Sequence, residues 1–97
     1  MEQPPAQARG IMPEISRFLG IVIRLFYSDH TPPHVHAEYQ GNKALLDFRG
    51  NVLRGDLGSR AMLRLVREWI DLHASELEED WNLARTGQEV NKIKPLE

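Results

Sequence analysis

The stretch HVHAEYQGNKALLDFRGNVLR, residues 34–54, carries the pattern that decides the fold. Apolar and polar residues alternate over residues 34–39, which is the period of a strand with one buried face, and residues 43–49 are predicted to form the next strand. The QGN turn between these segments favours a hairpin, because glycine and asparagine tolerate positive φ. Gly50-Asn51 then predicts a second tight turn into a short strand, residues 52–54. The stretch therefore predicts three consecutive antiparallel strands.

Two further strands are predicted upstream of this stretch. Residues 21–27 read IVIRLFY, in which Ile21, Ile23, Leu25 and Tyr27 fall on one face and β-branched residues are common. Residues 14–18, EISRF, form a shorter alternating segment. Together the segments predict an antiparallel meander of four or five strands.

The apolar period changes to 3.6 residues after the last strand, which predicts helices. Ser59 is the expected N-cap of the first helix, and its apolar stripe consists of Met62, Leu65, Val66, Trp69, Leu72 and His73. Ser75 with Glu78 three residues later has the pattern of a capping box and predicts a second start. Gly87 is expected to end that helix, and the tail beyond it to add a short strand or lie across the sheet. The expected fold is α+β, with two helices packed on one face of the sheet.

Length and composition indicate a single cytoplasmic domain. The chain has 97 residues, which fit one domain over residues 12–97 after a flexible tail, residues 1–11, with Met12 an alternative start. The absence of cysteine excludes disulfides, thiolate metal sites and cysteine nucleophiles. No apolar run approaches the roughly 20 residues of a membrane span, and the N-terminus lacks the apolar core of a signal peptide.

Charge is distributed unevenly along the chain. Residues 1–67 hold nine Arg and Lys against six Asp and Glu, whereas residues 68–97 hold three against eight. The split predicts a basic working face and an acidic flank.

Three of the four histidines lie within seven positions, in DHTPPHVHAEY, residues 29–39. On a strand, His34 and His36 share the face opposite to the core, and a two-residue step of about 6.6 Å lets their imidazoles converge. The Pro-Pro pair stiffens the approach and is expected to return His30 and Asp29 toward the start of the strand.

Three interpretations of this cluster stay open. In the structural one, His30 caps a turn while His34 and His36 stand on a solvated face. In the metal one, His34 and His36 bind a divalent ion such as zinc, with His30, Asp29 or Glu38 completing the set. In the acid–base one, no cofactor is needed: one histidine removes a proton and another delivers one, as in ribonuclease-like cleavage of a phosphodiester.

A phosphodiester substrate also requires cations. The candidates on strands are Arg24, Arg49 and Arg54, and the candidates on the first helix, at i, i+4 and i+7, are Arg60, Arg64 and Arg67. A row of guanidinium groups suits phosphate contacts, although a solvated helix face with local ion pairs has the same pattern. The helical stripe also leaves DNA binding open, without a recognition-helix motif to support it.

Two long segments resemble one bacterial family. They are MPEISRFLGIVIRLFYSDHTPPHVHAEYQGNKALLDF, from Met12, and LVREWIDLHASELEEDWNLARTGQEVNKIKPLE, to the C-terminus. The Asp29-His30 … Pro32-Pro33-His34-x-His36 run and the segment WNLA, residues 81–84, carry the resemblance most clearly. The family is the domain-of-unknown-function family four-one-six-zero. The resemblance implies the toxin of a bacterial toxin–antitoxin pair, with a small antitoxin-type protein as its partner.

The leading hypothesis joins this resemblance to the residues. The chain is expected to act on RNA or on translation, with His34 and His36 transferring protons, His30 assisting, and Arg24 and Arg54 steadying phosphate. The alternative is a non-enzymatic protein-binding or regulatory module, with a metal on the histidines. The sequence leaves the substrate and the oligomeric state open, a homo-oligomer included.

Overall fold

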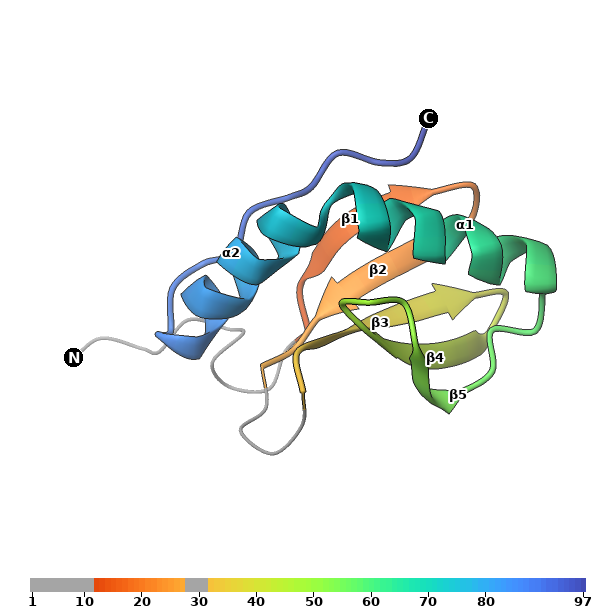
Figure 1. Ribbon diagram of the computed structural model, residues 1–97, viewed down its shortest axis with the longest axis horizontal. Coiled ribbons are helices and arrows are strands. Elements are labelled where there is room, and N and C mark those ends of the chain that lie inside the picture. The colour runs from red at the N-terminus through yellow and green to blue at the C-terminus, as the bar shows by residue number, and fades with distance from the viewer. Residues whose placement is uncertain (1–11, 28–31) are drawn as a thin grey trace.

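The computed structural model describes residues 12–27 and 32–97. They form five strands followed by two helices (Figure 1). The order of the strands in the sheet follows their order in the chain, and each neighbouring pair is antiparallel. The predicted α+β meander is therefore confirmed. The tail predicted over residues 1–11 lies outside the described residues.

The strands lie close to their predicted positions. Their bounds are β1 (Glu14–Phe18), β2 (Ile21–Leu25), β3 (His34–Tyr39), β4 (Asn42–Asp47) and β5 (Val52–Gly55). β4 ends two residues earlier than the predicted Arg49, because the carboxylate of Asp47 accepts hydrogen bonds from the backbone N–H groups of Arg49 and Asn51, both at 2.9 Å. Side-chain bonds of this kind reverse the chain locally in place of the ladder.

The QGN segment makes the predicted hairpin between β3 and β4. Gln40 has φ of 48° and Gly41 has φ of 84°. Two consecutive positive φ angles are the geometry of a type I′ turn, whose twist matches that of the paired strands.

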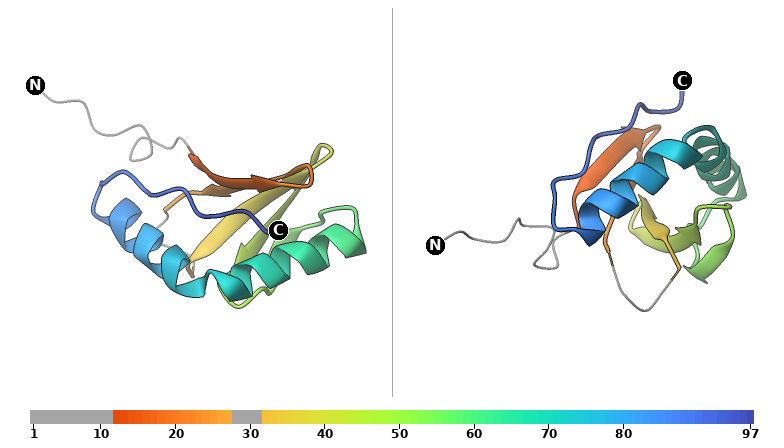
Figure 2. Two further views of the ribbon diagram at one scale, coloured as in Figure 1. Left: turned by 90° about the horizontal axis from the view of Figure 1, so that it is seen from above. Right: turned by 60° about the vertical axis from the view of Figure 1, so that its left-hand side comes forward.

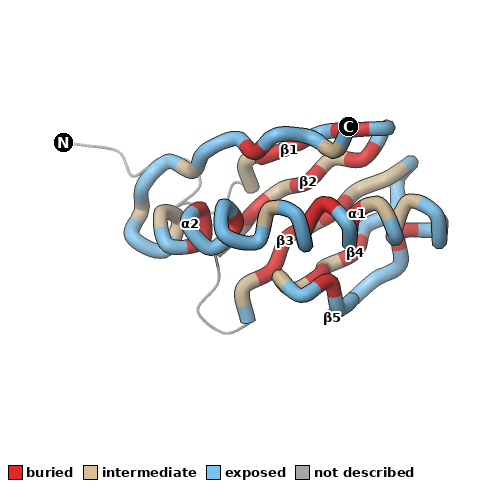
Figure 3. The backbone as a smooth tube through the Cα atoms, turned by 45° about the horizontal axis from the view of Figure 1, so that its top comes forward, coloured by how far each residue is buried: buried red, intermediate tan, exposed pale blue. Residues whose placement is uncertain are grey.

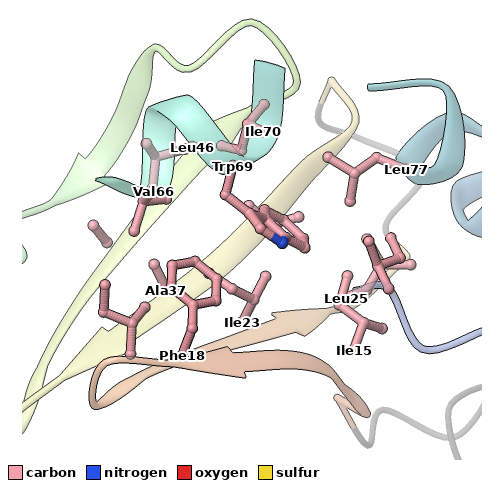
Figure 4. Packing of buried hydrophobic residues seen from close by; sticks show 14 of the residues in the cluster. Ile15, Phe18, Ile23, Leu25, Ala37, Leu46, Val66, Trp69, Ile70 and Leu77 are labelled. Atoms are coloured by element: carbon pink, nitrogen blue, oxygen red, sulfur yellow. The ribbon is translucent and has the colours of Figure 1, made fainter. Parts of the chain in front are cut away.

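The core lies between the sheet and the two helices, α1 (Arg60–Leu72) and α2 (Ala74–Arg85). Figure 4 shows Val66, Trp69 and Ile70 of α1 and Leu77 of α2 packed against side chains of the strands. Trp69 is fully buried, and its indole Nε1 donates to the carbonyl of Lys94 at 2.9 Å. Leu72, placed on the apolar stripe by the sequence, is 63% exposed, because it falls outside the arc that Val66, Trp69 and Ile70 occupy.

The helix boundaries confirm two predicted caps and correct a third. The Ser59 side chain accepts from the N–H of Met62 at 3.1 Å, as an N-cap does, and Gly87, with φ of 78°, follows the end of α2. The predicted capping box at Ser75 is wrong, because α2 begins at Ala74 and its N-cap, His73, makes no side-chain cap bond. The chain passes almost directly from α1 into α2, so Ser75 is already inside the helix.

The C-terminal segment covers one edge of the sheet. It forms no strand, but runs beside β1 (Figure 2), where the N–H of Ile93 donates to the carbonyl of Ile15 at 2.7 Å. Both helices lie on one side of the sheet, so within the described chain no helix covers its opposite face, hereafter the open face. No helix in the described ranges is long and apolar enough to span a bilayer.

Candidate functional site

The strand register places the predicted histidines on the open face. Across the sheet, Arg24 of β2 pairs with His36 of β3, His36 with Leu45 of β4, and Leu45 with Arg54 of β5. Directly opposed residues of antiparallel strands point to the same side, with Cβ atoms roughly 5 Å apart. Arg24, His36 and Arg54 therefore belong to one row, while the alternating residues Val35 and Ala37 are buried in the core.

The imidazoles of His34 and His36 lie together, as the sequence predicted. Their ring centroids are 5.2 Å apart with an interplanar angle of 55°. The Nδ1 of His34 lies 2.9 Å from the carbonyl oxygen of Pro32. Since a carbonyl only accepts, this Nδ1 carries a proton, and in the neutral ring Nε2 is the nitrogen that accepts. The backbone carbonyl of Pro32, two residues before His34, thus orients the His34 ring.

The expectation that both rings stand exposed is wrong for His34. It is only 3% exposed, because Trp81 of α2 covers the end of the sheet, with its ring centroid 5.7 Å from that of His34. Trp81 also contacts Tyr27 and Phe48, at centroid distances of 5.2 Å and 6.0 Å. His34 thus belongs to an aromatic cluster at the sheet end, and His36 is the more accessible of the pair.

Trp81 is buried, and its contact with His34 was not predicted from the sequence. The WNLA segment that contains it lies far from the histidine run in the chain. Helical periodicity shows that Trp81 faces inward, but not which strand end it meets. Only the placement of α2 after α1 brings the two segments together.

His36 is half-buried, and its surroundings favour the neutral ring. Burial lowers its pKa most, the nearby His34 and Lys43 lower it further, and Glu38 opposes them. Its Nε2 is covered by protein and has no hydrogen-bond partner among the described residues. A buried polar atom without a partner is uncommon in proteins, and because protein covers Nε2, only Nδ1 of His36 can meet a substrate.

Arg24 and Arg54 differ in their availability to an anion. The Nε of Arg24 donates to Oε2 of Glu38 at 3.2 Å, and its Nη1 donates to the carbonyl of Met12 at 3.2 Å. Arg54 is exposed on the edge strand, and no residue of the described chain forms an ion pair with it. Two strand spacings, about 10 Å, separate it from His36.

The arginines of α1 lie on the other side of the sheet from His36. Arg60 and Arg64 are exposed, while the Nε of Arg67 donates to the carbonyl of Gly50 at 2.8 Å and thereby holds the β4–β5 turn against the helix. The structure does not bring these three residues to the histidine pair. Their role in phosphate binding stays a prediction.

A shallow hollow of about 400 Å³ adjoins the sheet end near His34. Its walls come from the Pro-Pro pair, the turn after β4 and the start of α2, and its lining residues are Pro32, Pro33, Asp47, Phe48, Arg49, Asn51, Ala74 and Glu78. An aromatic face, an arginine and polar side chains are the groups that hold an unstacked base.

The metal interpretation has two ligands and lacks a third in the part of the chain that the structure describes. Over residues 12–27 and 32–97, no three His, Cys, Asp or Glu side chains gather closely enough to hold an ion. His30 and Asp29, which the sequence offered as further ligands or as an assisting base, lie outside the described residues.

The family described as Domain of unknown function (DUF4160) matches residues 20–82, which is more than half of the chain. The chain belongs to the DUF4160 family. The matched segment contains both the histidine run and Trp81, so the contact between His34 and Trp81 lies within the DUF4160 region. Comparison with curated proteins and with solved structures finds no match.

Proposed function

We propose that this chain is the RNA-directed component of a toxin–antitoxin pair, and that the open face around His36 cleaves phosphodiester bonds by acid–base chemistry. One observation carries the proposal: two imidazoles lie 5.2 Å apart beside a row that holds Arg24 and Arg54. We expect the chain to work in the cytoplasm, because RNA and the translation machinery are found there.

The proposed step gives His36 the role of the base. In its neutral form, His36 takes the proton of a ribose 2′-hydroxyl on Nδ1, because protein covers Nε2, and the 2′-oxygen attacks phosphorus while the bond from phosphorus to the 5′-oxygen breaks. The imidazole pair then returns a proton to the leaving 5′-oxygen, so the products are a 2′,3′-cyclic phosphate and a 5′-hydroxyl. The lowered pKa of His36 supports this assignment, because a neutral ring at pH 7 is ready to accept.

His34 is proposed to hold the neighbouring His36 ring in position. Its bond to Pro32 and its contact with Trp81 fix the ring, and a fixed neighbour holds His36 in one orientation. Arg54 meets the phosphate directly, and Arg24 does so when it releases Glu38. His30 keeps its assisting role as part of the proposal.

Induced expression in a bacterium tests this function. Growth arrest by the wild-type chain and loss of arrest in the double variant His34→Ala/His36→Ala are expected. His73→Ala is the matched control, because His73 caps α1 on the helical side of the sheet, and its variant should still arrest growth. Arrest by the double variant equal to that of the wild type removes the histidines from the mechanism.

The second candidate function is a non-enzymatic protein-binding module. The specific observation in its favour is the exposed edge of β5, which carries apolar side chains. Metal on the histidines is an optional part of that candidate, because two imidazoles alone leave coordination positions to be filled. A homo-oligomer remains part of either proposal.

A further inference from the structure

β5 is an open edge of the sheet. The order of the strands makes β1 and β5 the two edges, but the C-terminal segment covers β1 through the bond from Ile93 to Ile15. Within the described ranges, no segment besides β4 pairs with β5, and all four of its residues are exposed (Figure 3). An edge of this kind presents N–H and C=O groups that are ready to pair with another strand.

The side chains of β5 do little to block such pairing. Val52 is 37% exposed and Leu53 is 43% exposed. Natural proteins guard their edges with proline, lysine, bulges or a covering element. β5 is four residues long, carries Arg54 and has a bulge where its register with Leu45 and Leu46 shifts, but it has no proline and no lysine. Exposed aliphatic groups on an uncovered edge indicate a surface that another chain covers.

The charges around β5 are mainly positive. Arg54 is exposed on the strand itself. The bond from Arg67 to Gly50 shows that this stripe of α1 faces the β4–β5 turn, and Arg60 and Arg64 precede Arg67 on the same stripe at helical spacing. Asp56, the nearest acid in sequence, accepts from the N–H of Gly58 at 2.8 Å and sets one negative charge against these arginines. The surface therefore complements an acidic ligand.

We propose that β5 binds an extended segment of a partner protein in which acidic and apolar residues alternate. Backbone pairing supplies affinity, and alternate side chains reach the aliphatic groups of β5 and the arginines. A second copy of this chain fits less well, because antiparallel pairing of two β5 strands brings two sets of arginines together, and opposed like charges are destabilising.

This inference rests on the proposed function only for the existence of a protein partner, and it does not depend on the histidines. It also gives the partner a way to inhibit. An acidic side chain bound beside Arg54 occupies the cation that the open face offers to phosphate, so the partner and RNA compete for one residue.

An NMR titration of the full ¹⁵N-labelled chain tests the inference, with a peptide of alternating glutamate and valine as the probe. Amide shifts are expected at Val52–Gly55 and in the facing part of β4. The double variant Arg60→Glu/Arg64→Glu should weaken binding by about tenfold or more, because the new glutamates repel the glutamates of the peptide. Arg85→Glu, an exposed arginine of α2, is the matched control and should bind as the wild type does.

Three results overturn the inference. They are no shift in β5 at millimolar peptide, equal binding of a peptide of alternating lysine and valine, and equal binding by the Arg60→Glu/Arg64→Glu variant. His36→Gln should leave peptide binding unchanged. Binding with loss of RNA activity in that variant supports both proposals, whereas binding without any RNA activity in the wild type removes the histidine chemistry alone.

Discussion

Arg24 lies directly across the β2–β3 ladder from His36, yet its guanidinium is bonded to Glu38, two residues further along β3. The cation directly opposite the proposed base is thus held by an acid on the same face. Glu38 also opposes the lowering of the His36 pKa. One carboxylate therefore influences both groups on which the proposed chemistry depends.

Replacing Glu38 by glutamine should strengthen RNA binding. The change releases Arg24 and removes a negative charge beside the phosphate path, so we expect an affinity gain of several-fold, on the order of 1 kcal/mol for one charge-assisted contact. Fluorescence anisotropy with a short single-stranded RNA at low salt measures the change. Glu68→Gln is the matched control, because Glu68 is exposed on α1, on the helical side of the sheet and away from Arg24. Equal gains in the two variants would mean that net charge, and not Arg24, is responsible.

His36 should make the fold sensitive to mild acid. Because its pKa is lowered in the folded chain, the unfolded chain takes up a proton first as the pH falls through about 6.5, and the folded state loses stability below that value. His36→Gln removes this titration. Urea unfolding between pH 7.5 and pH 5 should show a steeper loss of stability for the wild type than for the variant. Parallel curves would contradict the assigned surroundings of His36.

Asp80 should act in the opposite direction. Burial raises its pKa, the N–H of Asn91 that bonds to its Oδ1 at 2.9 Å lowers it, and Glu79 and Glu76 raise it, with a net rise. The folded chain therefore holds this proton more tightly than the unfolded chain, and stability falls as the pH rises from about 3.8 through the raised value.

The variant Asp80→Asn checks this sign. Its free energy of unfolding relative to the wild type should increase as the pH rises from 4 to 7, because the variant has no buried carboxylate to charge. Denaturant unfolding across that range measures the difference. Asp71→Asn, at an exposed position of α1, serves as the control, and for Asp80→Asn a difference that stays constant with pH would contradict the burial argument.

Gly55 should be the least replaceable glycine at the sheet edge. It has the same φ, 84°, as Gly41, but a Cβ at Gly55 would lie 2.3 Å from the carbonyl oxygen of Lys43, whereas a Cβ at Gly41 meets nothing within 4 Å. Gly41→Ala should cost roughly 1–2 kcal/mol, from the left-handed conformation alone. Gly55→Ala should cost clearly more in thermal or denaturant unfolding. Equal costs would show that β5 moves freely away from β4.

The sequence predicted the sheet well because its signals are local. Alternation over residues 34–39 fixes which face each histidine occupies, and the glycine at position 41 fixes the hairpin and hence the register with β4. Ser59 likewise identified the start of α1 from its own side chain. Each of these features depends on neighbours within a few residues.

The site was predicted less completely because its surroundings come from distant segments. Burial of His34 depends on Trp81, and capture of Arg24 depends on Glu38, which the sequence offered as a metal ligand. From the sequence, Arg60, Arg64 and Arg67 were treated as one phosphate-binding feature. In the structure, Arg67 has a structural role instead, because its Nε donates to the carbonyl of Gly50. Periodicity gives the face of an element, and packing decides what that face meets.

Cleavage of a single-stranded RNA by the purified chain tests the central claim most directly. The wild type should release fragments ending in a 2′,3′-cyclic phosphate, should leave the same oligonucleotide intact when its sugars are 2′-deoxyribose, and should lose activity in a folded His36→Gln variant. Cleavage at equal rates by the wild type and this variant, or no cleavage by the wild type, would contradict the account.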